Sequence, residues 1–277
     1  MTRRNIIIIK VVFTILTLVI VGTFTDDNSL MAENHKVLSN MTVGQKLIEY
    51  KLKVEKVYNH NRTAYTQGLF FNQGVLYEST GQYGESSFRK VDLETGKVLN
   101  FKSFDSKYFL EGSCVMDGRL YILTWRAGLV FVYDLDSMNL LGQLPNQKEG
   151  WGLTTDGKQL ITSNGTDKIY FVDPMSFISK REIKVSMNGK PVSYLNELEY
   201  IDGKIWANVY LQDYIVVINP YTGIVEAKVD CRNLLPDSLK NSYTDVLNGI
   251  AWDSQTGCLY LSGKYWPRLY KVSLIRK

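Results

Sequence analysis

The feature that most constrains the fold is a short motif that occurs five times between residues 67 and 249. Each copy is a polar or aromatic residue next to a Gly or Glu, and an apolar run and a hairpin turn follow it. The copies are Gln67-Gly68, Glu111-Gly112, Trp151-Gly152, Asn196-Glu197 and Asn248-Gly249. Self-similarity at roughly 40–50 residues indicates a propeller or an array of small units, in which each unit buries its apolar face against its neighbours.

Each repeat predicts four antiparallel strands. A turn such as Asp117-Gly118 separates the first two, because glycine supplies the positive φ that a tight hairpin needs. A third apolar run follows, such as residues 129–133 in the second repeat. A fourth strand comes after it, such as residues 97–99 in the first repeat. The last repeat stops after its third strand, and residues 52–58 can supply the fourth. We therefore predict an all-β fold, a five-bladed β-propeller whose ring is closed by its N-terminal strand.

The opening residues are expected to share one mouth of the central channel, because the start of one antiparallel strand lies beside the end of the next. This pairs Gln67 with Gly81, Glu111 with Trp125, Trp151 with Gly165, Asn196 with Tyr210, and Asn248 with Lys264. The set combines one carboxylate, one ammonium, amides and aromatic rings, which is typical of a small-molecule or peptide-end site. The alternative is that each residue only caps its own blade, but capping requires neither two Trp nor a Glu that faces a Lys.

Motifs in all five repeats resemble the plant and bacterial type of glutaminyl-peptide cyclotransferase, over about residues 54–274. They are Tyr65-Thr66-Gln67-Gly68-Leu69, Leu76-Tyr77-Glu78-Ser79-Thr80-Gly81, Leu110-Glu111-Gly112, Leu123-Thr124-Trp125, Glu149-Gly150-Trp151-Gly152-Leu153, Leu195-Asn196-Glu197-Leu198-Glu199, Leu247-Asn248-Gly249-Ile250-Ala251-Trp252 and Ser262-Gly263-Lys264-Tyr265-Trp266-Pro267. The family is a five-bladed propeller and is unrelated to the zinc-dependent animal enzyme. The resemblance implies conversion of an N-terminal Gln of peptides or proteins to pyroglutamate with release of ammonia, without metal or cofactor.

The resemblance also implies roles for individual residues. Glu111 would be the general acid and base, and Asn196 and Lys264 would stabilise the tetrahedral oxyanion. The substrate-binding residues would be Gln67, Trp125, Trp151, Trp206, Tyr65, Phe109, Asn248 and Trp266. Glu78 receives no role.

Two other functions are open at this point. Glu111, Asn196 and Asn248 could hold a divalent cation, as the oxygen ligands of propeller lactonases do, although Lys264 would lie beside it. A non-catalytic propeller could instead bind peptides or sugars through a Trp-rich mouth.

The N-terminus predicts export. Arg3 and Arg4 precede a mostly apolar stretch at residues 5–24, which fits a signal peptide or an uncleaved membrane anchor. We assign residues 1–25 to this segment, 26–47 to a linker and 48–277 to the catalytic propeller. The expected location is therefore secreted, periplasmic or in the secretory lumen, with membrane association through residues 5–24 if the segment is retained, and the expected state is a monomer.

The composition limits the kinds of partner, metal site and disulfide that we expect. A net charge of +4 over 277 residues, with no long basic run, does not favour nucleic acid. The only histidines, His35 and His60, precede the repeats, so a His-based zinc site inside the propeller is not expected. The chain has three cysteines, which cannot all pair within one chain. Cys114, Cys231 and Cys258 are expected to be small buried side chains, and a disulfide between Cys231 and Cys258 remains open.

Overall fold

The computed structural model describes residues 46–277, and this part of the chain is almost entirely β-structure. Three of its sheets each contain four consecutive antiparallel strands. They are β2 (Thr66–Asn72), β3 (Val75–Thr80), β4 (Ser87–Val91) and β5 (Val98–Ser103); β6 (Leu110–Met116), β7 (Arg119–Thr124), β8 (Leu129–Asp134) and β9 (Leu140–Pro145); and β10 (Leu153–Thr155), β11 (Leu160–Ser163), β12 (Lys168–Val172) and β13 (Ser179–Lys184).

A fourth sheet has eight strands in the order β16-β17-β18-β19-β1-β22-β21-β20. Its strands are β16 (Leu195–Ile201), β17 (Lys204–Val209), β18 (Tyr214–Ile218), β19 (Val225–Asp230), β1 (Ile48–Asn59), β22 (Arg268–Arg276), β21 (Cys258–Gly263) and β20 (Leu247–Asp253). Because β1 pairs antiparallel with β22 and parallel with β19, the sheet is two four-stranded antiparallel units joined through β1. A small hairpin, β14 (Ser186–Met187) with β15 (Lys190–Pro191), and the 3₁₀ turn η1 (Asp237–Leu239) complete the described elements.

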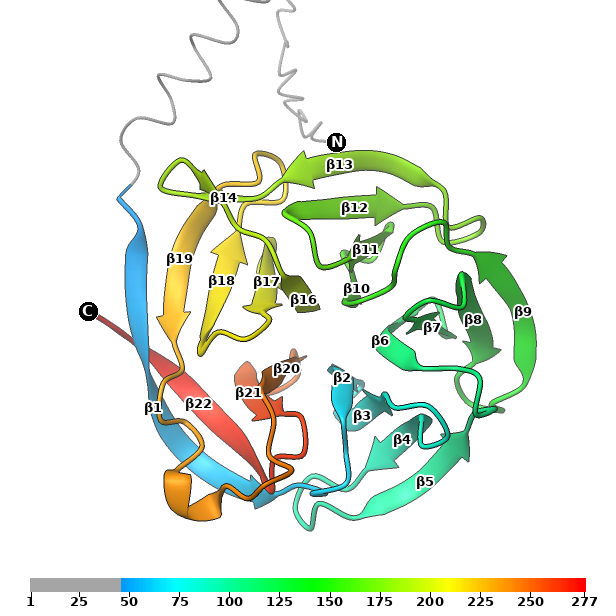
Figure 1. The fold of residues 1–277 in the computed structure, drawn as a ribbon, viewed down its shortest axis with the longest axis horizontal. Coiled ribbons are helices and arrows are strands. Elements are labelled where there is room, and N and C mark those ends of the chain that lie inside the picture. The colour runs from blue at the N-terminus through cyan, green and yellow to red at the C-terminus, as the bar shows by residue number, and fades with distance from the viewer. Residues whose placement is uncertain (1–45) are drawn as a thin grey trace, which may run out of the picture. The chain divides into compact units, whose positions relative to one another are not determined.

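The four-stranded units follow one another around a central axis (Figure 1). β2, β6, β10, β16 and β20 lie nearest the middle, and β5, β9, β13, β19 and β1 lie outermost. The apolar core fills the gaps between successive units: Leu123 and Leu160 share one cluster, and Leu69 and Leu269 share the cluster that joins the first unit to the last. The all-β prediction is confirmed, and the arrangement is propeller-like.

The predicted pairing of residues 52–58 with the last strand is present. Leu52 lies opposite Leu274 and Tyr58 opposite Leu269, with a β-bulge between Val54 and Lys56. The expected signal or anchor at residues 1–25, and the linker up to residue 45, lie outside the described residues. From residue 46 onward no helix has the length and apolarity needed to cross a membrane.

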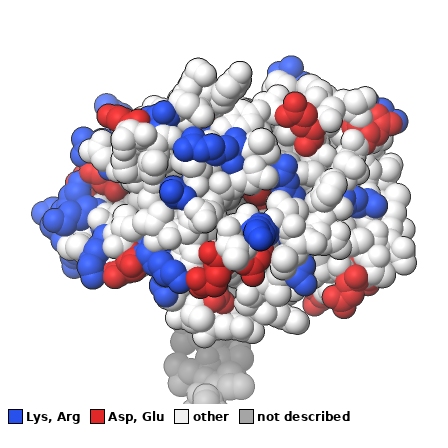
Figure 2. Space-filling model, turned by 90° about the horizontal axis from the view of Figure 1, so that it is seen from below, with Lys and Arg blue, Asp and Glu red and all other residues white. Residues whose placement is uncertain are grey.

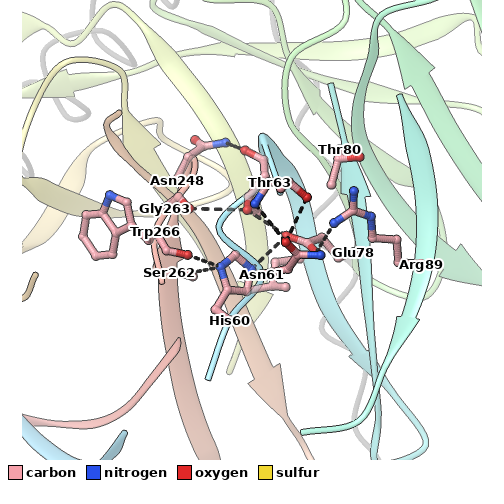
Figure 3. Close-up of polar contacts among 12 residues, drawn as sticks. His60, Asn61, Thr63, Glu78, Thr80, Arg89, Asn248, Ser262, Gly263 and Trp266 are labelled. Carbon is pink, nitrogen blue, oxygen red and sulfur yellow. Dashed lines mark hydrogen bonds and ion pairs between the residues drawn. The ribbon is translucent and has the colours of Figure 1, made fainter. Parts of the chain in front are cut away.

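A buried ion pair secures this closure (Figure 3). His60, just after β1, lies between the last unit and the first: its Nδ1 donates to the Trp266 carbonyl at 2.7 Å, and its Nε2 lies 3.0 Å from the Glu78 carboxylate. The Thr66 hydroxyl donates to the same Glu78 oxygen at 2.7 Å, and Arg89 Nη1 lies 3.9 Å from the other oxygen. A polar contact therefore links the chain entering the first unit to both units that it joins.

Two further predictions concern the cysteines and the distribution of surface charge. Cys114, Cys231 and Cys258 are all free thiols, so the Cys231–Cys258 disulfide is absent. On the face drawn in Figure 2, basic and acidic side chains are both spread over the surface. On this face the mixed charges form no continuous basic track of the kind that a nucleic acid follows.

Candidate active site

The repeated motif coincides with an irregularity in the innermost strands. In β2, β6, β16 and β20 the pairing with the next strand shifts register at the motif, as a β-bulge does. A bulge re-aims side chains and is common near active sites. The residues within these bulges include Gln67, Glu111, Asn196 and Asn248, and all four side chains are buried.

The glycine of the motif is explained by crowding at the axis. A Cβ at Gly112 would lie 2.5 Å from the backbone nitrogen of Leu153, and one at Gly152 would lie 2.0 Å from the carbonyl oxygen of Asn196. The innermost strands of neighbouring units therefore approach backbone to backbone, and the Gly112 amide donates to the Trp151 carbonyl at 2.7 Å. At the fourth copy a Glu takes this place, and Glu197 accepts from the amide of Ile250 at 2.9 Å.

The bulged residues open into a cavity of about 280 Å³. Its lining combines a carboxylate, an ammonium, two amides and five aromatic rings: Tyr65, Gln67, Phe109, Glu111, Trp125, Trp151, Asn196, Tyr210 and Lys264. The volume lies near the lower end of the range for small-molecule sites, roughly 300–1,000 Å³. That size fits a ligand of about one residue.

Glu111 is the chemically distinctive group of the cavity. Its side chain is 5% exposed, and none of the side chains in residues 46–277 forms a hydrogen bond or a close ion pair with its carboxylate. Burial raises the pKa of Glu111 well above its usual range; the positive charge of Lys264 opposes this shift, and the negative charge of Glu149 adds to it. A carboxyl whose pKa is raised towards neutrality can both accept and donate a proton.

Lys264 is the matching cation. Burial lowers the pKa of its ammonium, and the charges of Glu111 and Asp245 oppose the shift. Its Nζ lies 4.6 Å from the centroid of the Tyr65 ring and 5.1 Å from that of Tyr210, so two ring faces stabilise the charge. The cation is thereby held inside the cavity without direct contact to any acidic side chain of residues 46–277.

Two amides complete the polar lining. The Oδ1 atom of Asn196 is buried and has no hydrogen-bond partner among residues 46–277. Gln67 is held from behind, because Asn248 Nδ2 donates to its Oε1 at 3.3 Å and to the Thr66 carbonyl at 2.9 Å.

The aromatic wall consists of two groups of rings. Phe109 packs against Trp125 with centroids 5.5 Å apart, and against Tyr65 at 5.9 Å. On the other side, Trp151 meets Tyr210 edge to face at 5.8 Å. The rings give the cavity the apolar walls that the sequence predicted.

Three predicted substrate-binding residues do not line the cavity. Trp206 lies in the apolar core between the last two units, and the ring in the cavity is Tyr210. Four residues along a strand span about 13 Å, so Trp206 lies well away from Tyr210 and the mouth. The motif pairing with Asn196 did indicate Tyr210, whereas the assignment of Trp206 followed the family resemblance, and the structure places Trp206 outside the cavity.

The other two residues support the site from outside the cavity. Trp266 packs on Gly263 and donates its Nε1 to the Asp245 carbonyl at 2.8 Å, while the Asp245 amide donates to the carbonyl of Lys264. Asn248 holds Gln67, as described above. Because Asn248 is outside the cavity, the set of Glu111, Asn196 and Asn248 expected for a lactonase-like cation site is not assembled, and within residues 46–277 no group of three His, Cys, Asp or Glu is placed to hold a metal.

The strand pattern of the sequence did not indicate Glu149. Its carboxylate lies behind the cavity and accepts from both Trp125 and Trp151. It falls in an irregular loop between β9 and β10, outside the strand pattern on which the site was predicted. Its only signal was its place in the motif Glu149-Gly150-Trp151-Gly152.

Comparison with known proteins places the chain in a family. A family model for glutamine cyclotransferase matches residues 28–274. The chain belongs to the glutamine cyclotransferase family. It is 40% identical over 240 residues to a glutaminyl-peptide cyclotransferase of Arabidopsis thaliana, covering 85% of this chain and 74% of that one.

A solved structure supports the same placement. The crystal structure of Myxococcus xanthus glutaminyl cyclase superposes with a TM-score of 0.78 at 31% identity, over 84% of this chain and 100% of that one. The family expected from the sequence motifs is therefore confirmed, and with it the enzyme class, a glutaminyl-peptide cyclotransferase.

Proposed function

We propose that the cavity closes the N-terminal glutamine of a peptide or protein into pyroglutamate, with Glu111 as the proton carrier. The observation that carries this mechanism is a buried carboxyl that no side chain of residues 46–277 binds, in a cavity the size of one residue. The α-amine forms a bond to the γ-amide carbon, and the bond from that carbon to the amide nitrogen breaks. Glu111 takes the proton that the attacking amine loses and gives it to the departing nitrogen, which leaves as ammonia.

The cavity contributes by restricting geometry. Attacker and target belong to the same residue, so the enzyme gains most by holding the side chain folded back on its own amine. Trp125, Trp151 and Tyr210 enclose the methylene groups of the side chain, and their rings exclude water from the reacting atoms. A cavity of this size accepts a chain terminus and excludes an internal glutamine.

Lys264 and Asn196 stabilise the tetrahedral intermediate. When the amine adds, the γ-carbonyl oxygen becomes an oxyanion, and donors already fixed in a low-dielectric site stabilise it strongly. The ammonium of Lys264 supplies the charge, and the Nδ2 group of Asn196 supplies a second donor. Gln67, fixed by Asn248, binds the substrate amide.

We also propose that the four-stranded units are the blades of a five-bladed propeller. This proposal is supported by the apolar cluster between each successive pair of units and by the cluster joining the last unit to the first. Three innermost strands, β2, β6 and β16, would then supply Gln67, Glu111 and Asn196 to the cavity. Export through residues 1–25 remains a proposal that rests on Arg3, Arg4 and the apolar stretch after them.

The decisive experiment is incubation with a Gln-initiated dipeptide and a coupled ammonia assay. We expect ammonia and a pyroglutamyl product in equal amounts. The matched control is the same dipeptide acetylated at its α-amine, which removes the nucleophile and should release none. Saturable binding of the free dipeptide without ammonia release would favour the non-catalytic binding propeller.

A further inference from the structure

The carboxylate of Glu149 connects the two tryptophans of the cavity. Its Oε2 accepts a hydrogen bond from Trp125 Nε1 at 3.0 Å and one from Trp151 Nε1 at 3.3 Å. Its Oε1 accepts from Arg126 Nε at 2.8 Å. Glu149 does not line the cavity itself, so whatever it does for a substrate is done through the rings that it holds.

The two indoles come from different sheets, and this makes a shared acceptor consequential. Trp125 follows β7 and Trp151 precedes β10, so no strand pairing within one sheet sets their relative orientation. An indole nitrogen can only donate, and one oxygen that receives both fixes each ring against the other. The backbone reinforces the arrangement, since the Gly150 amide donates to the Trp125 carbonyl at 3.1 Å.

Arg126 completes the assembly on the outer side. Its guanidinium carbon lies 3.9 Å from the centroid of the Trp125 ring while its Nε binds Glu149. Trp125 is therefore held by a cation over its face and by a carboxylate at its edge. This geometry is specific for Arg, whose planar group stacks and donates at once.

We infer that Glu149 is a positioning residue for cyclisation, whose single carboxylate sets both indole walls of the cavity at the separation that a glutamine side chain requires. The inference rests on the proposed function of the cavity. Glu149 touches no reacting atom. The negative charge of Glu149 also contributes to raising the pKa of Glu111. Solvent screening limits this effect, because the Glu149 side chain is 38% exposed.

Two substitutions separate the positioning of the indoles from the effect of the Glu149 charge on the pKa of Glu111. Glu149→Gln removes the charge and leaves one acceptor oxygen for three donors. Glu149→Asp keeps the charge but is shorter by one methylene, so it cannot reach both indoles. The control is Glu182→Gln, which removes the carboxylate that binds Lys168 at 2.7 Å and lies on the outermost strand β13.

We expect both Glu149 variants to raise KM for the Gln dipeptide roughly tenfold while kcat changes less, because the walls bind ground state and transition state alike. A purely structural role would instead reduce the amount of active enzyme and leave KM unchanged. Only Glu149→Gln should move the acid side of the pH profile of kcat/KM to lower pH, since it removes a charge that raises the pKa of Glu111. Glu182→Gln should match the parent protein in every measurement.

Tryptophan fluorescence provides a test that does not depend on turnover. We expect the emission of the unliganded protein to shift in both Glu149 variants and to stay unchanged in Glu182→Gln. If the parent protein releases no ammonia, the proposed function fails, while the emission shift still reports on the tethered indoles. Unchanged emission together with unchanged KM in both Glu149 variants would overturn the inference.

Discussion

Glu78 and Glu111 are two carboxylates of similar burial whose surroundings make them opposites. Both side chains are at most 5% exposed. Glu78 is contacted by His60 and Thr66, whereas none of the described side chains binds Glu111. Burial raises the pKa of each, but the charge and hydrogen bond of His60 outweigh it at Glu78, whose pKa is lowered, while at Glu111 burial prevails over the charge of Lys264. Partners, and not burial, decide which carboxylate is structural and which is chemically active.

The strongest test of this contrast is activity after Glu111→Gln. The substitution keeps the shape and removes the proton carrier, so kcat should fall by ~10²–10⁴-fold, the usual contribution of general acid–base catalysis. Folding should survive, because a buried carboxyl without a partner is costly rather than stabilising. Ammonia release and thermal melting measure both effects.

The matched control is Glu78→Gln. The folded protein should keep a kcat close to that of the parent, because Glu78 reaches no cavity atom. If Glu111→Gln retained most of its activity while Glu78→Gln abolished it, the assignment of the catalytic carboxylate would be wrong.

The second test is stability after His60→Ala. Removing one partner of a buried ion pair leaves the other charge without its counter-ion, which typically costs ~3–5 kcal/mol. We expect a loss of that order in the free energy of unfolding in urea, and no comparable loss for Glu111→Gln. Equal stability of parent and His60→Ala would show that the pair contributes nothing to ring closure.

The third test is pH, because the pKa of Glu78 is lowered and that of Glu111 is raised. The pKa of His60 is raised: burial lowers it, but Glu78 and the Trp266 carbonyl outweigh burial. Its contribution to stability is therefore complete below the ordinary histidine value of about 6.5 and is lost as pH rises through the raised value. The contribution of Glu78, whose pKa is lowered, is complete above about 4.3 and is lost as pH falls through the lowered value.

Activity should follow the opposite course on the alkaline side. Glu111 must be ionised to accept a proton, so kcat/KM should fall as pH drops through its raised pKa. Denaturant unfolding and dipeptide turnover over the same pH series measure the two profiles. A His60→Ala variant whose stability still peaked between about pH 4.3 and 6.5 would contradict the assignment of that window to the pair.

The smallest effect is expected from chelation. Protein groups fill every role in the proposed mechanism, and Lys264 disfavours a cation beside Glu111. Turnover in EDTA should therefore remain close to the untreated value. A loss of activity that a divalent ion restores would mean that Glu111 acts as a metal ligand, and the contrast with Glu78 would need a different explanation.

The sequence predicted much of this, because the information lay in a regular pattern. Turn residues and alternating apolar runs located the strands, and the repeated motif located Gln67, Glu111 and Asn196 at one mouth. Pairing within one hairpin also placed Trp125 and Tyr210. Each of these predictions used contacts between neighbouring strands, which depend on local spacing.

What the sequence missed depends on contacts between distant residues. His60 finds its partners at Trp266 and Glu78, in the last unit and the first, and no spacing indicates that contact. Glu149 lies in a loop that has no alternating pattern of apolar residues. Trp206 was assigned from the family resemblance and not from strand register, and register places Tyr210 in the cavity.

The closure of the ring by β1 has a consequence for how the protein is made. β1 is the first described strand to leave the ribosome, yet its antiparallel partner β22 is the last, and roughly 200 residues separate them. Pairings this far apart in sequence form slowly, since a long loop must close before any contact is gained. Until β22 has been synthesised, the edge of β1 that it covers and the free edge of β21 stay unpaired and open to association with other chains. Loss of the last ten residues would therefore be expected to harm the yield of folded protein far more than loss of ten residues from a surface hairpin.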